Sequence, residues 1–198
     1  KGSATMASTN EVITLNLIPE IVEQAERLKT WRQHIHAHPE MAFKEYDTAA
    51  FVAERLREFG LTVHEGIAGT GVVGTLTKGG GNRAIGLRAD LDALPIVEAN
   101  TFEHASKTPG VMHACGHDGH TCMLLGAAAY LAKAETFSGT VHFIFQPAEE
   151  NEGGAKTMIE AGLFEQFPVE AVYGMHNIPG IPVGHFAVKP GPMMAAFD

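Results

Sequence analysis

The sequence has few basic residues and no long apolar run. Its 14 Lys and Arg residues stand against 23 Asp and Glu residues, which leaves a formal net charge of -9. Binding to the phosphates of a nucleic acid needs a basic face. A helix that spans a membrane needs about 20 consecutive, mostly apolar residues. We therefore expect neither a nucleic acid nor a membrane as a partner.

Cysteine is also scarce, with only Cys115 and Cys122 in one short segment. A disulfide framework would spread its cysteines along the chain, so this pair favours a reducing cytoplasm as the location. Residues 1–9 are small and polar and lack the apolar stretch of a signal peptide. We interpret them as an expression scar around Met6.

The chain does contain regular patterns of apolar residues, and its 198 residues suffice for a core. Apolar residues at spacings of three and four indicate helices, and short apolar runs between turn residues indicate strands. The helices are expected at 18–36, 48–59 (capped by Asp47), 119–133 and 152–161. The strands are expected at 61–64, 71–78, 84–90, 140–145, 171–175 and 185–188. This alternation predicts an α/β sandwich with a largely parallel sheet.

Four polar clusters follow or precede these elements. They are Arg88–Asp92, the loop with Cys115 and His117, Gln146–Glu150 and Gly174–Asn177. In α/β folds, ligands bind beyond the carboxyl ends of the strands. A thiol, imidazoles and carboxylates at one edge suit a divalent metal such as zinc, or a pair of ions sharing a bridging water.

The pair Glu149-Glu150 has two interpretations. Neighbouring residues after a strand point in different directions, so one carboxylate can bind metal while the other acts as a general base. The alternative is a solvated acidic loop. The Cys and His residues near other strand ends favour the first interpretation.

Several long motifs resemble the hippurate hydrolase and indole-acetyl-amino-acid hydrolase branch of the aminoacylase/carboxypeptidase zinc exopeptidases. The motifs are RQHIHAHPEMAFKE, RADLDALPI, MHACGHDGHTCMLLGAA, FIFQPAEENEGGAKTMIEAGL and GMHN. The resemblance implies a three-layer α/β/α catalytic domain with a mostly parallel, mixed sheet. It also implies two divalent ions, zinc or manganese, with nickel and cobalt as further candidates.

The same resemblance implies a role for each matched residue. Cys115 would bridge the metals as a thiolate, with His117, Glu150 and His176 as further ligands. Glu149 would be the general base. Asp90 and Asp118 would orient imidazoles.

The implied reaction is hydrolysis of an N-acyl amino acid, a small-molecule substrate. Residues 10–190 would form the N-terminal part of the catalytic domain, and residues 191–198 would begin the connection to a lid and dimerisation domain. The resemblance thus implies a homodimer for the complete protein. A chain without the lid and the last histidine ligand is expected to be weakly active or inactive by itself.

Two other functions compete with this one. Cys115 could act as the nucleophile of a cysteine hydrolase, with His113 or His117 as its base. The chain could also be a metal-binding module without catalysis. His34, His36 and His38 do not share a helix face and are expected to pack rather than bind metal. We expect structural roles for His113 and His120, and a loop position for Glu98.

Overall fold

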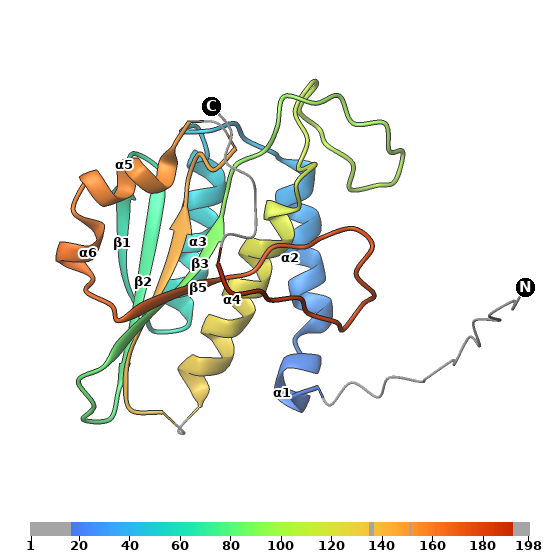
Figure 1. Cartoon of the computed structure of the whole chain (residues 1–198). Helices are drawn as coiled ribbons and strands as arrows, with labels where there is room; N and C mark the ends of the chain where they lie inside the picture. The colour runs from blue at the N-terminus through green and yellow to red at the C-terminus, as the bar shows by residue number, and fades with distance from the viewer. Residues whose placement is uncertain (1–16, 135–136, 151, 192–198) are drawn as a thin grey trace, which may run out of the picture.

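The computed structural model describes residues 17–134, 137–150 and 152–191 of the chain (Figure 1). The proposed scar at residues 1–9 and nearly all of the proposed connection at 191–198 lie outside these ranges. None of the helices in the described part of the chain is long and apolar enough to span a bilayer.

The strands of the described residues form one sheet in the order β1-β2-β4-β3-β5. They are β1 (Thr62–Ile67), β2 (Gly71–Lys78), β3 (Ala84–Asp90), β4 (Gly139–Gln146) and β5 (Ala171–Gly174). β3 pairs in parallel with both β4 and β5, whereas β2 pairs antiparallel with β1 and β4. All the strands except β2 therefore run in one direction, and the expected mostly parallel, mixed sheet is confirmed.

Helices cover both faces of this sheet. α1 (Pro19–Val22), α2 (Ala25–Ala37), α3 (Tyr46–Glu58) and α4 (His117–Lys133) lie on one side, and α5 (Gly154–Glu160) and α6 (Leu163–Gln166) lie on the other (Figure 1). This is the three-layer α/β/α sandwich that the resemblance implied.

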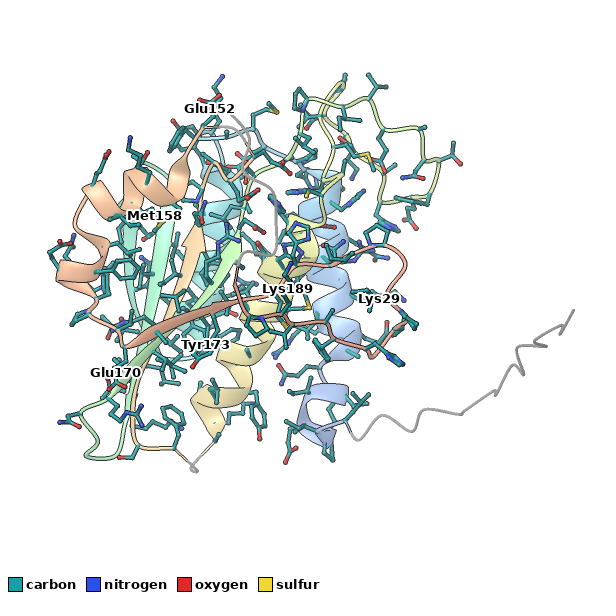
Figure 2. All side chains as sticks on the ribbon, in the orientation of Figure 1. Lys29, Glu152, Met158, Glu170, Tyr173 and Lys189 are labelled. Atoms are coloured by element: carbon teal, nitrogen blue, oxygen red, sulfur yellow. The ribbon has the colours of Figure 1, made fainter. Side chains whose placement is uncertain are left out.

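The side chains of the central strands alternate between two apolar cores. Val72, Phe143 and Phe145 pack toward the larger core with α2, α3 and α4. Val73 and Ile144 face the smaller core, where Met158 points from α5 toward the sheet (Figure 2). Phe143 and Phe145 are 0% exposed, and burying a side chain of this kind stabilises the fold by about 2–3 kcal/mol. The strands that carry the polar clusters are thus held from both faces.

Some expected boundaries differ from the structure. The helix expected at 18–36 is divided into α1 and α2 by a turn at Glu23 and Gln24. α3 begins at Tyr46, before the expected cap Asp47. Its first free N–H groups are held by Glu40, whose carboxylate accepts the N–H of Asp47 at 3.1 Å and of Thr48 at 2.8 Å. Glu40, six positions before the first residue of the helix, therefore does what Asp47 was expected to do.

The prediction of a strand at 185–188 is wrong. The segment is described, but it pairs with no other strand among the described residues. Phe186 and Val188 are 83% and 92% exposed. An apolar alternation alone does not make a strand, because a strand needs a partner for its backbone N–H and C=O groups.

Candidate metal centre

The candidate site lies at the carboxyl ends of β3, β4 and β5. β3 ends at Asp90, β4 at Gln146 and β5 at Gly174, and the polar clusters follow directly. Because these strands are parallel neighbours, their carboxyl ends meet at one edge of the sheet. α4 begins at His117 and contacts β3, so its first turn reaches the same edge.

His117 is at the centre of the cluster and is 0% exposed. Its Nδ1 lies 3.2 Å from Asp92 Oδ1. Its Nε2 lies 3.6 Å from Glu150 Oε1 and 3.7 Å from both Glu149 Oε2 and Asp90 Oδ2. His117 Nε2 and Glu150 Oε1 are both buried, and neither has a hydrogen-bond partner among the described residues.

Cys115 and His176 complete the cluster on its exposed side. Cys115 Sγ lies 3.3 Å from His176 Nε2. The possible ligand atoms of Cys115, His117 and His176 all lie within 4.8 Å of one another, as do those of His117, Glu149 and Glu150. The structure therefore brings the other four expected catalytic and metal residues around the imidazole of His117.

Gly116 allows this close approach. Its φ of 89° is in the left-handed region that favours glycine. A Cβ at this position would lie 2.4 Å from Asn177 Oδ1. Asn177 follows His176 and contacts Nε2 of His120 on α4 through its side chain at 2.5 Å. The missing side chain of Gly116 lets the segment after β5 rest on the start of α4, which places His176 beside Cys115.

The site carries several negative charges on its carboxyl groups. Burial alone would raise the pKa of Asp90, but a hydrogen bond from His120 and the charge of Arg88 outweigh it and hold that pKa at about 2. Burial likewise acts to raise the pKa of Asp92, but hydrogen bonds from His117 and from the backbone N–H of Glu150 and Glu149 lower it. These carboxyl groups therefore stay ionised.

The same negative charge acts on the thiol. Burial, a hydrogen bond with Glu150 and the charges of Glu149 and Asp90 raise the pKa of Cys115 to about 12. A thiol with this pKa is protonated at neutral pH and is a poor nucleophile. A bound cation reverses this effect and favours the thiolate.

These observations fit a divalent cation. A separation of 3.6 Å between His117 Nε2 and Glu150 Oε1 is too long for a hydrogen bond. It is close to the separation of two atoms that each lie about 2 Å from one ion. An unpartnered buried nitrogen beside an unpartnered buried carboxylate oxygen is costly in an apolar interior, and a cation would satisfy both atoms.

Asp118 does not face this cluster. On α4 it follows His117 directly, so it points about 100° away around the helix. Its Oδ2 lies 2.9 Å from His36 Nδ1 and 3.1 Å from Arg32 Nη1. His36 Nε2 in turn lies 3.1 Å from Glu98 Oε1. Asp118 thus orients an imidazole, but that imidazole is on α2 and is not an expected ligand.

The buried side chain of His36 predicts a pH-dependent stability. Hydrogen bonding to Asp118 raises its pKa most, burial opposes this rise, and Glu98 adds to it. The other groups around it are Arg32, which binds Asp118, and the rings of His104 and His113.

A raised pKa in the folded state stabilises the fold below the ordinary value of 6.5. This stabilisation is lost as the pH rises through the folded value. We therefore expect His36→Gln to lower the free energy of unfolding, and to lower it by more at about pH 6 than at about pH 9. Urea denaturation of both proteins at the two pH values measures this difference. An equal difference at both values would mean that folding does not raise the pKa of His36.

Three residues of the site were not among the catalytic, metal-binding or orienting residues expected from the sequence. Asp92 accepts from both the His117 ring and the Glu150 backbone N–H, the latter at 3.1 Å. His120 contacts Asp90 Oδ1 at 2.7 Å and, with Asp90 and His117, forms a third group of possible ligand atoms. Asn177 joins His120 to the segment after β5. The Asp-Leu-Asp spacing was the available signal for Asp92, because residues two apart at a strand end share a face.

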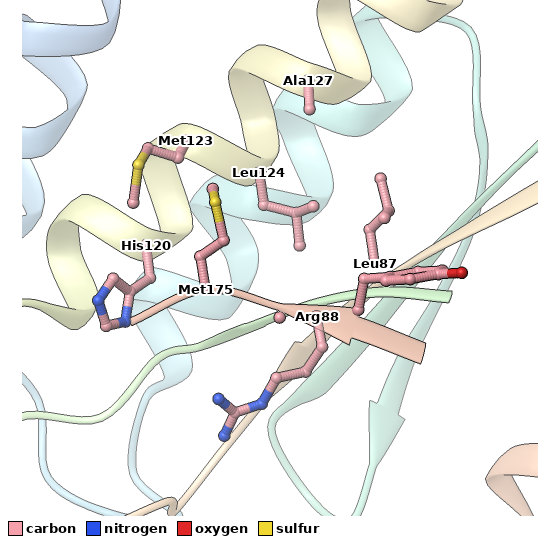
Figure 3. Close-up of a pocket in the computed structure, with 9 residues that line it drawn as sticks. Leu87, Arg88, His120, Met123, Leu124, Ala127 and Met175 are labelled. Carbon is pink, nitrogen blue, oxygen red and sulfur yellow. The ribbon is translucent and has the colours of Figure 1, made fainter. Parts of the chain in front are cut away.

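An apolar pocket of about 220 Å³ lies beside the site, between α4 and strands β3 and β5 (Figure 3). His120 and Arg88 are at its polar end, and Met123, Leu124 and Met175 form apolar walls. The expected ligands do not line it.

The fold and the cluster together define the class of protein: an α/β/α domain with ligand-type side chains at the carboxyl edge of parallel strands. Residues 86–194 match peptidase family M20/M25/M40, and the chain belongs to this family. The resemblance inferred from the motifs is thereby confirmed.

The chain is similar over most of its length to curated relatives. It is 52% identical over 184 residues to the hippurate hydrolase of Campylobacter jejuni. This match covers 93% of this chain and 48% of the relative. It is 46% identical over 185 residues to the N-acyl-L-amino acid amidohydrolase of Geobacillus stearothermophilus. This match covers 90% of this chain and 50% of the relative. The chain thus spans about half the length of these curated relatives.

A solved structure has the same fold. The YXEP protein of Bacillus subtilis, described as a dinuclear metal binding peptidase of the M20 family, matches with a TM-score of 0.82 at 41% identity. The match covers 86% of this chain and 48% of that chain.

Proposed function

We propose that this protein is a metal-dependent amidohydrolase that cleaves N-acyl amino acids of the hippurate type. The observation that carries the proposal is the unpartnered His117 Nε2, buried among three carboxylates and close to Cys115 and His176. The names of the relatives from Campylobacter jejuni and Geobacillus stearothermophilus support the substrate class.

Cys115, His117, Glu150 and His176 would hold two divalent ions. Bound ions of this kind polarise the amide carbonyl and lower the pKa of an attacking water. A thiolate ligand favours softer ions, so zinc suits the site, with manganese, nickel and cobalt as alternatives. Asp92 would orient His117 through Nδ1, as carboxylates next to metal-binding histidines do.

Glu149 would be the general base. Its side chain is 38% exposed, whereas the neighbouring Glu150 side chain is 19% exposed. A substrate and a water molecule can therefore reach Glu149 from solvent. Its carboxylate would take a proton from the water that attacks the carbonyl carbon. As the carbon–nitrogen bond breaks, the same proton would pass to the leaving amine.

Removing metal tests this function. We expect a strong chelator to abolish hydrolysis of benzoyl-glycine by the full-length protein, and added zinc or manganese to restore it, because the ions supply the activation of the water. A thiol alkylator applied to the metal-loaded protein is the comparison. If the alkylator inactivated the metal-free and metal-loaded proteins alike while the chelator had no effect, Cys115 would act as a nucleophile. The raised pKa of Cys115 argues against that outcome.

Two further expectations belong to this proposal. The scarcity of cysteine supports a cytoplasmic location. The resemblance implies a homodimer of the complete protein, which size-exclusion chromatography with light scattering tests directly.

A further inference from the structure

Glu45 is a buried carboxylate outside the candidate metal centre. It directly precedes α3 and is 0% exposed. Its Oε2 accepts the hydroxyl hydrogen of Thr70 at 2.5 Å, and its Oε1 accepts the backbone N–H of Ala148 at 2.9 Å. Burial raises its pKa, while these hydrogen bonds act to lower it. No Lys, Arg or His of the described ranges forms an ion pair with it.

Its partner Ala148 directly precedes the two glutamates of the site and has an unusual backbone. The φ of Ala148 is 51°, in the left-handed region that costs a non-glycine residue about 1–2 kcal/mol. The C=O of Ala148 accepts the N–H of Gly154 at 2.9 Å. A Cβ on Gly154 would lie 1.8 Å from the carbonyl oxygen of Pro147, so the turn packs backbone against backbone. A turn in this conformation persists only where its surroundings hold it.

Buried carboxylates hold the turn on both sides of Glu149. Glu45 binds the N–H of Ala148, the residue before it. Asp92 binds the N–H of Glu150, the residue after it, at 3.1 Å. Thr70 lies between β1 and β2, so Glu45 connects this turn to α3 and to the β1–β2 connection.

We propose that Glu45 is a positioning residue that fixes the Ala148 turn and thereby sets the directions of the Glu149 and Glu150 side chains. The proposal rests on the proposed function, in which these two glutamates are the base and a ligand. A buried carboxylate without a cationic partner is an expensive way to fill space. It is a strong acceptor for an N–H in a strained turn, because hydrogen bonds to charged groups are stronger than neutral ones.

The main test is Glu45→Ala in the full-length protein, with two measurements that do not use substrate. The first is hydrogen exchange of the Ala148 amide in the metal-free protein, which we expect to become at least ~10-fold faster when its charged acceptor is lost. The second is the visible absorption spectrum of the cobalt(II)-loaded protein, which reports the ligand geometry. We expect this spectrum to change and the affinity for cobalt(II) to fall ~10–100-fold, as when groups that orient ligands are removed.

Glu40→Ala is the matched control. Glu40 also binds N–H groups at the start of α3, but within the described part of the chain its side chain bonds only to Asp47 and Thr48. We expect it to lower the thermal midpoint while leaving Ala148 exchange and the cobalt spectrum unchanged. Glu45→Gln should restore much of the wild-type behaviour, because an amide oxygen still accepts from Ala148.

If Glu45→Ala does not fold, Thr70→Val replaces it. This variant removes the hydroxyl that binds the Glu45 carboxylate and puts a side chain of similar size at residue 70. We expect a smaller change in the same two measurements. The proposal would be overturned if Glu45→Ala, or Thr70→Val in its place, showed both wild-type exchange at Ala148 and a wild-type cobalt spectrum. If the wild-type protein binds no divalent ion, the proposed function fails, and the exchange measurement alone still decides whether Glu45 holds the turn.

Discussion

Replacing Glu149 with Gln should lower the kcat for benzoyl-glycine at least ~100-fold while leaving the metal content unchanged, since general base catalysis contributes on this scale. The carboxamide has nearly the same shape, but it cannot accept the proton of the attacking water. Glu149 is the more exposed of the two adjacent glutamates, and its Oε2 lies 3.7 Å from His117 Nε2. It can therefore reach both the solvent and the centre of the site.

Glu152→Gln is the control for this variant, because Glu152 is an exposed carboxylate shortly after the same turn. It should retain full activity. Metal analysis of both purified variants accompanies the steady-state kinetics. If Glu149→Gln kept most of its turnover, or lost its metal together with its turnover, the roles assigned to Glu149 and Glu150 would be exchanged or wrong.

Replacing His117 with Ala should weaken the binding of divalent ions by more than ~100-fold, beyond the loss seen when only an orienting group is removed. His117 belongs to every group of possible ligand atoms found in the described part of the chain. Without its ring, the carboxylates of Asp90, Glu149 and Glu150 lose the imidazole that lies among them. Competition with a chromophoric chelator measures the affinity.

His142→Ala is a suitable control because it also removes a buried imidazole, in this case from β4. His142 is 6% exposed and its Nδ1 lies 2.9 Å from the Thr75 hydroxyl, with no candidate ligand among its hydrogen-bond partners. It should destabilise the fold without changing the metal affinity. Unchanged affinity in a folded His117→Ala protein would exclude His117 as a ligand and remove the basis of the proposed centre.

The sequence predicts most of the fold because its apolar periodicity reports burial directly. The short runs at 84–90 and 140–145 lie between helical layers in the structure, as their apolar composition indicates. The segment at 185–188 has similar residues but no neighbouring strand among the described residues. Pairing depends on a distant part of the chain, so a local pattern cannot reveal it.

The candidate site is only partly visible in the sequence for a related reason. Cys115, His117, Glu150 and His176 occur in motifs, so their grouping could be expected. The partners of each ring depend on the side of α4 from which it projects. His117 and His120 face the strand ends, whereas Asp118 faces His36 on α2. The hydrogen bond from Ala148 to Glu45 spans 103 residues of sequence, and no spacing rule predicts it.

The parallel pairing of β3 with β4 also has a consequence for how the site is assembled. Arg88 and Gln146, which meet at the ends of these strands, are 58 residues apart in the chain, and Cys115 and His176 are 61 apart. Contacts between such distant residues form late in folding, because the loops between them must be closed first. An unfolded chain therefore offers an ion no assembled site, and an ion that binds only the native state shifts the equilibrium toward it by mass action. The free energy of unfolding is therefore expected to rise with the concentration of the ion.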